Sequence, residues 1–107
     1  MFILFKRMLC VLCLFVPTHL VAKDIHIVTT IKPIESLIAN IIDANDSVSS
    51  IIDGNYSPHN FSLKPSHIAK IYKSDVVILI NSDFETFMRS SFKIIPEKTT
   101  IITLSSA

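Results

Sequence analysis

Glycine and cysteine are scarce in this chain, and their scarcity excludes several kinds of functional site. Gly54 is the only glycine among 107 residues, so the sequence has no glycine-rich phosphate loop and no dinucleotide-binding fingerprint. Both cysteines, Cys10 and Cys13, lie in the first 22 residues. If that segment is removed, no disulfide and no cysteine nucleophile remain in the mature chain.

A strong excess of charge is also lacking. Ten basic and nine acidic residues give a formal net charge of +1, and no basic patch favours a nucleic-acid partner. The sequence contains neither an HExxH motif nor a serine nucleophile elbow. No pair of acids is marked out for a hydrolase site either. We therefore expect a protein that is not an enzyme.

The N-terminal segment has the layout of a signal peptide. Lys6 and Arg7 precede an apolar run over 8–16, and Leu20-Val21-Ala22 is an acceptable cleavage site. The run is too short for an uncleaved membrane anchor, which needs about 17–25 apolar residues. The sequence predicts cleavage after Ala22, export to the periplasm or beyond, and one small domain over 23–107.

Alternating apolar patterns over the rest of the chain predict an α/β fold. β-branched runs typical of strands and apolar residues at helical spacing follow one another as βαβαβαβ. Crossovers of this length favour a parallel, right-handed arrangement with helices flanking the sheet. The expected strands are 25–30, 47–52, 75–80 and 99–104, and the expected helices begin at Pro33, at Ser62 or Pro65, and at Asp83.

Each expected helix has an apolar face. The first carries Ile34, Leu37, Ile38, Ile41 and Ile42 and ends at 43–46; the second turns Ile68, Ile71 and Tyr72 inward; the third carries Phe84, Phe87, Met88 and Phe92. Asp83 is a natural N-cap for the third helix, with Glu85 in its first turn. The chain stops just after a strand, so we expect an exposed strand edge that favours aggregation.

His59 is the candidate metal ligand. It follows Pro58 in the loop between the second strand and the second helix, and neutral imidazole is a good ligand for zinc and other transition metals. The alternative is a solvated loop histidine. Asp53 and Tyr56 flank the loop and are expected to line its cleft. We expect His67 to be a surface helix residue and His26 to be a packed or edge histidine.

Several short motifs occur together in one order. Thr30-Ile31-Lys32-Pro33 leads into the first helix, and Gly54, Pro58, His59 and Phe61 form a Gly-x-x-x-Pro-His-x-aromatic loop. Pro65-Ser66 and Ser74-Asp75-Val76-Val77 follow, and then Glu85, with Asn81 where glycine is common. This arrangement resembles the N-terminal lobe of the zinc- and manganese-binding solute-binding proteins of bacterial ABC importers, the ZnuA/TroA-like cluster.

The resemblance implies a function for the chain. It implies periplasmic capture of a divalent metal, zinc or else manganese, for delivery to an ABC permease in the inner membrane, with His59 as the first ligand. Glu85 would be a surface contact for the permease. The family builds its site from two lobes, and its other ligands lie beyond residue 107. A second chain carrying the C-terminal lobe is therefore a further expected partner.

Three alternatives remain open from the sequence. The chain is a truncated or split gene product without useful metal binding, because half of the ligand set is absent. It is a surface adhesin or interaction protein of the same family, since some members are described as adhesins. Or it is an unrelated flavodoxin-like domain, against which the single glycine and the signal peptide both weigh.

Overall fold

The structure is a computed structural model that describes residues 1–4 and 23–106. The predicted cleavage site and most of the predicted signal peptide lie outside these residues. Within the described part of the chain, no helix is long and apolar enough to cross a membrane.

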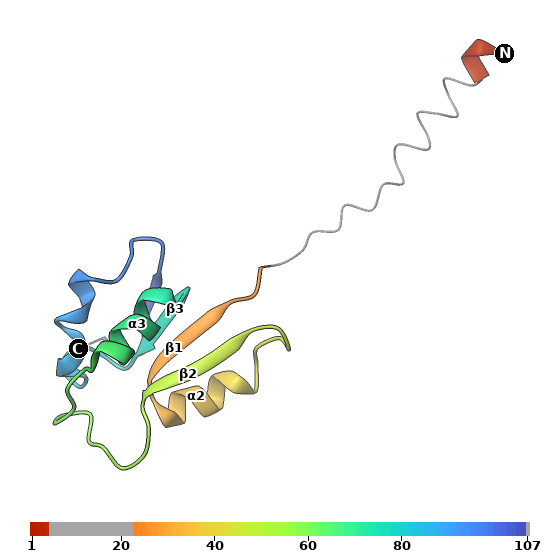
Figure 1. The fold of residues 1–107 in the computed structure, drawn as a ribbon. Helices are drawn as coiled ribbons and strands as arrows, with labels where there is room; N and C mark the ends of the chain where they lie inside the picture. The colour runs from red at the N-terminus through yellow and green to blue at the C-terminus, as the bar shows by residue number, and fades with distance from the viewer. Residues whose placement is uncertain (5–22, 107) are drawn as a thin grey trace.

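Four parallel strands form a single sheet, as predicted (Figure 1). They are β1 (His26–Ile31), β2 (Ser47–Ile52), β3 (Val76–Leu79) and β4 (Thr100–Thr103), in the order β2-β1-β3-β4. Thr29 of β1 pairs with Ser50 on one side and with Ile78 on the other. This register brings the carboxyl ends of the three strands to one edge of the sheet, where open α/β sheets bind ligands.

Two helices cover opposite faces of this sheet (Figure 1). The helix α2 (Lys32–Ala39) joins β1 to β2, and α3 (Pro65–Lys73) joins β2 to β3. The two crossovers run in opposite directions across the sheet, because β2 lies on one side of β1 and β3 on the other. Since both crossovers are right-handed, the helices are placed on opposite faces.

The main hydrophobic core lies on the face of the sheet that α3 covers. Its buried members are Val28, Ile51, Ile71, Val77 and Met88, one from each of the five elements that meet there. Phe61 and Phe87 pack against this cluster and remain partly exposed. The core therefore joins the loop after β2 to the segment after β3.

The first helix is shorter than predicted. The prediction ended it at 43–46, whereas α2 ends at Ala39. The Asn40 side chain donates a hydrogen bond to the Ser36 carbonyl at 2.8 Å, which satisfies an acceptor of the last turn. Only Ile34 of α2 is buried, whereas Leu37 and, beyond the helix, Ile41 are exposed, so the predicted apolar face is only partly buried.

The predicted third helix is replaced by two short 3₁₀ turns. These are η2 (Thr86–Met88) and η3 (Ser91–Lys93), and Asp83 does not cap either of them. The reason is Glu85, whose buried carboxylate binds the end of β3 instead of facing solvent in a first helical turn. Met88 is buried as predicted, but the regular helical face is not formed.

In α3 only part of the predicted inward face is buried. Ile71 is fully buried, whereas Ile68 and Tyr72 are exposed. The nine-residue helix meets the core at Ile71, so Ile68, one turn earlier, and Tyr72, the next residue, stay at the rim.

The two edge strands differ in how they are protected. On β2, the backbone of Ser50 is engaged by side chains from both helices. On β4, all four residues are exposed, including Ile101 and Ile102, which lie on opposite faces of the strand. The expected exposure of apolar surface at the last strand is confirmed, because no described element covers β4.

We expect this exposed edge to drive self-association. Unpaired strand groups beside apolar side chains pair readily with another chain, and a charge at such an edge prevents it. Ile102→Lys should therefore lower the apparent mass of the concentrated chain measured by light scattering. Leu37→Lys, which changes an equally apolar exposed residue on α2, is the control. Equal self-association of both variants would contradict the prediction.

Candidate metal-binding site

The loop that carries His59 begins where β2 ends and finishes at Pro65, the first residue of α3. Gly54 has a φ of 83°, a left-handed conformation that other residues rarely adopt, and it turns the chain away from the sheet. Pro58 restricts the backbone next to His59. The loop therefore projects from the carboxyl edge of the sheet, as the sequence predicted.

His59 is exposed, and its ring rests against an aromatic side chain. Its centroid lies 5.1 Å from that of Phe84, at an interplanar angle of 71°. The His59 backbone N–H donates to the Ser57 hydroxyl at 3.3 Å. Among the described residues, no hydrogen bond engages either ring nitrogen of His59. The imidazole is thus oriented by packing, on an exposed residue whose ring nitrogens make no hydrogen bond within the described residues.

Phe61 anchors the far side of the loop. Its ring centroid lies 5.1 Å from that of Phe87 in η2, 5.2 Å from that of His67 in α3, and 6.0 Å from that of Tyr56. Edge-to-face aromatic pairs add about 0.5–1.5 kcal/mol beyond their area burial. Through Phe61, the loop is attached to the core two residues after His59.

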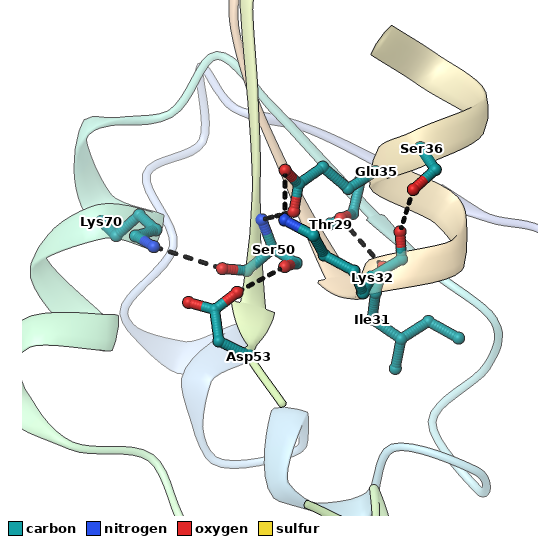
Figure 2. Close-up of polar contacts among 8 residues, drawn as sticks. All are labelled: Thr29, Ile31, Lys32, Glu35, Ser36, Ser50, Asp53 and Lys70. Carbon is teal, nitrogen blue, oxygen red and sulfur yellow. Dashed lines mark hydrogen bonds and ion pairs between the residues drawn. The ribbon is translucent and has the colours of Figure 1, made fainter. Parts of the chain in front are cut away.

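Ser50, which is buried in β2, anchors the start of the loop (Figure 2). Its hydroxyl donates to Asp53 Oδ1 at 3.0 Å, and its backbone N–H donates to Glu35 Oε2 at 2.9 Å. Lys70 Nζ donates to the Ser50 carbonyl at 3.2 Å. Figure 2 shows Glu35 and Lys70 reaching Ser50 from the two sides of β2. The base of the loop is therefore fixed by both helices.

These contacts lower the pKa of Glu35. The bond from Ser50 favours the charged carboxylate most, and the 2.9 Å ion pair with Lys32 adds to the effect. The Glu35 side chain is only 19% exposed, so solvent screens the interaction less than on an open surface. Glu35 therefore remains ionised at mildly acidic pH.

His67 is oriented against metal binding. Its Nδ1 accepts a hydrogen bond from the Lys64 backbone N–H at 3.0 Å, which leaves the proton of the neutral ring on Nε2. Burial lowers the pKa of His67, and the nearby Lys64 and Lys70 add to this. It is a half-buried residue of the first turn of α3, where it satisfies the backbone at the helix start.

His26 does not fit its prediction as a packed or edge histidine. It lies in β1, which is a central strand, and its side chain is exposed at the amino end of the sheet. Its Nδ1 is 2.7 Å from the Ser47 hydroxyl. The opposite end of the sheet carries His59, so these two histidines cannot share a metal ion.

The two acidic residues after β3 also differ from their predictions. Asp83 is exposed and pairs with Arg89 at 2.5 Å. Glu85 is fully buried, so it cannot be the predicted surface contact. Its carboxylate accepts bonds from the Thr30 hydroxyl at 2.5 Å and from the backbone N–H groups of Ile80 and Asn81, each at 3.0 Å.

A complete metal site is not present within residues 1–4 and 23–106. No group of three or more histidine, cysteine or carboxylate side chains comes together there in a way that could hold a metal ion. Asp53 and Tyr56 line an open hollow of about 410 Å³ beside the loop, as predicted, and His67 lines it too. His59 is therefore a single exposed imidazole, and the described residues do not supply the other ligands that a metal site needs.

The roles of two residues in the site, Phe84 and Glu85, were not predicted from the sequence. The sequence places Phe84 on the apolar face of the third expected helix, but its ring packs against His59. The sequence places Glu85 in the first turn of a helix, but its buried carboxylate accepts a hydrogen bond from Thr30. Both residues belong to the motifs that carry the resemblance. Nothing in the sequence linked the two motifs, because 55 residues separate them and only the pairing of β1 with β3 brings them together.

Removal of the Glu35 charge should weaken the base of the loop. We expect Glu35→Gln to lower the free energy of unfolding by about 1 kcal/mol at neutral pH, because a charged acceptor becomes neutral and the Lys32 pair is lost. The native pKa of Glu35 is lowered, so its contribution is complete above the ordinary value of 4.5 and is lost as the pH falls through the native pKa.

Urea unfolding of the chain and this variant across that pH range tests the prediction. The difference between them should shrink as the pH falls below 4.5. Glu97→Gln, which changes an exposed carboxylate, is the control and should match the unmodified chain. A difference that stays constant down to strongly acidic pH would contradict the assignment.

Known proteins resemble this chain in sequence and in fold. The chain is 27% identical over 95 residues to the high-affinity zinc uptake system protein ZnuA of Haemophilus ducreyi, covering 89% of this chain and 30% of that protein. It therefore spans about a third of that relative's length. Its fold matches the Zn(II)-bound ZnuA-like domain of Streptococcus pneumoniae AdcA with a TM-score of 0.66 and 22% identity, covering 76% of this chain and 31% of the other.

The structure of a mutant, Mn-bound periplasmic metal-binding protein from Candidatus Liberibacter asiaticus matches with a TM-score of 0.69 and 18% identity, covering 79% of this chain and 32% of the other. At these identities the solved structures establish the fold alone. The family model described as "Zinc-uptake complex component A periplasmic", ZnuA, matches residues 27–107, which is most of the chain. The chain therefore belongs to the ZnuA family.

Proposed function

We propose that this chain captures a divalent metal ion in the periplasm, zinc first and manganese second, for delivery to an ABC permease in the inner membrane. The metal is cargo in this proposal, and the chain performs no chemical reaction on it. His59 is the first ligand. The observation that carries the proposal is an exposed imidazole at the carboxyl edge of a parallel sheet, with both ring nitrogens free of protein hydrogen bonds in the described structure.

Family membership supports the choice of cargo. The relative from Haemophilus ducreyi is named for zinc uptake, and the matched structures include zinc-bound and manganese-bound proteins. Imidazole suits zinc, while manganese favours sites richer in carboxylate and water. His59 alone therefore favours zinc, and the ligands that accompany it would decide the preference.

The proposal includes a second contributor to the site. Zinc sites in proteins use three or four protein ligands, and the described residues supply one suitable histidine. A second lobe, carried on another chain, would supply the rest. Without it, we expect this chain to bind zinc only weakly. The competing proposal is that the chain has no useful metal binding, which the same shortage of ligands among the described residues supports.

Zinc titration of the chain tests the function. We expect weak, saturable binding by isothermal titration calorimetry that is lost in His59→Ala and kept in His26→Ala. Both variants remove an exposed histidine, but His26 lies at the opposite end of the sheet. Binding that is no tighter in the unmodified chain than in His59→Ala would overturn metal capture by this chain.

A further inference from the structure

We propose that Glu85 is a positioning residue for His59, acting through Asn81 and Phe84. The inference deepens the proposed function, since it concerns how the first metal ligand is held. It rests on contacts among four residues, of which only His59 is exposed to solvent as a ligand would require.

The first step is the buried carboxylate of Glu85. It is 0% exposed, and its partners in the described structure are three hydrogen-bond donors. Oε1 accepts from Thr30 and from the Ile80 N–H, and Oε2 accepts from the Asn81 N–H. Burying a carboxylate is costly unless it is well hydrogen-bonded, so these bonds fix the backbone at 80 and 81.

The second step is the turn that follows. The Glu85 N–H donates to the Asn81 carbonyl at 3.0 Å, which closes the segment from Asn81 to Glu85 into one turn. Inside this turn, Asn81 Oδ1 accepts from the N–H of Asp83 at 3.0 Å and of Phe84 at 2.8 Å. Asn81 thus fixes the backbone of Phe84, and Glu85 in turn fixes the backbone of Asn81.

The third step is the contact between Phe84 and His59. The edge-to-face geometry, at 5.1 Å between centroids, places one aromatic ring against the imidazole. Since the described protein offers no hydrogen bond to the ring nitrogens of His59, this contact is what restrains the ring. In most metal sites a hydrogen bond to the second nitrogen orients a histidine ligand, and here the aromatic contact takes that role.

A carboxylate is needed at position 85 because it faces only donors. A glutamine would place its amide nitrogen against either the Ile80 N–H or the Asn81 N–H, and one of these bonds would be lost. Glu85→Gln should therefore loosen the turn while keeping the size of the side chain. Thr30→Val is the matched control, because it removes a bond to the same carboxylate and leaves both backbone bonds in place.

The test is the NMR signals of the His59 ring protons in the full chain, without metal. We expect Glu85→Gln to shift them toward the positions seen in Phe84→Leu, where the neighbouring ring is absent. Thr30→Val should leave them nearly unchanged, as should the His26 signals in all variants. In a Phe84→Leu background, Glu85→Gln should have no further effect, because the coupling runs through Phe84.

A folded Glu85→Gln with unchanged His59 signals would overturn the proposal. If that variant does not fold, Asn81→Ala replaces it, since it removes the bond to the Phe84 N–H and spares the carboxylate; unchanged His59 signals there would overturn the proposal equally. Zinc titration is a separate readout, and Glu85→Gln should weaken binding by up to about 10-fold. If the unmodified chain binds no zinc, metal capture fails, while the ring signals still decide the role of Glu85.

Discussion

The buried carboxylate of Glu85 is the constraint on which the rest of the site depends. It joins the carboxyl ends of the two central strands, because Thr30 belongs to β1 and Ile80 follows β3. A carboxylate without solvent must satisfy its oxygens with donors, and here two backbone N–H groups and one hydroxyl do so. This requirement replaces a regular third helix with a tight turn and two 3₁₀ segments. The same turn delivers Phe84 to the loop of His59.

Two supports hold the loop that carries His59 from opposite sides of the sheet edge. On the β2 side, Ser50 donates hydrogen bonds to Glu35 and Asp53 and accepts one from Lys70, so both helices fix the point where the loop begins. On the β3 side, the rings of Phe84 and Phe87 meet the loop at His59 and Phe61. The loop is therefore exposed at its tip but restrained along its length. Preorganisation of this kind reduces the entropy lost when a ligand binds.

The fold also explains why the described residues do not form a complete metal site. The carboxyl edge of the sheet carries one exposed histidine, His59. The Nδ1 of His67 is used in a hydrogen bond at the start of α3, and His26 lies at the amino end of the sheet. A parallel sheet gathers ligands only from loops at one edge, and in the described residues these loops offer few metal-binding side chains. The described chain spans about a third of the length of the proteins it matches.

The sequence by itself determined the α/β class, the four parallel strands to within two residues, and His59 as the exposed candidate ligand. These follow from local patterns, namely β-branched runs, proline at helix starts and a single glycine in the loop. It did not determine the end of α2, the loss of the third helix, or the roles of Phe84 and Glu85. Helical spacing and a first-turn acid predict a helix equally well whether or not the acid is buried. Only the tertiary structure decided this, because burial of Glu85 depends on β1 and β3 pairing across 55 residues of sequence.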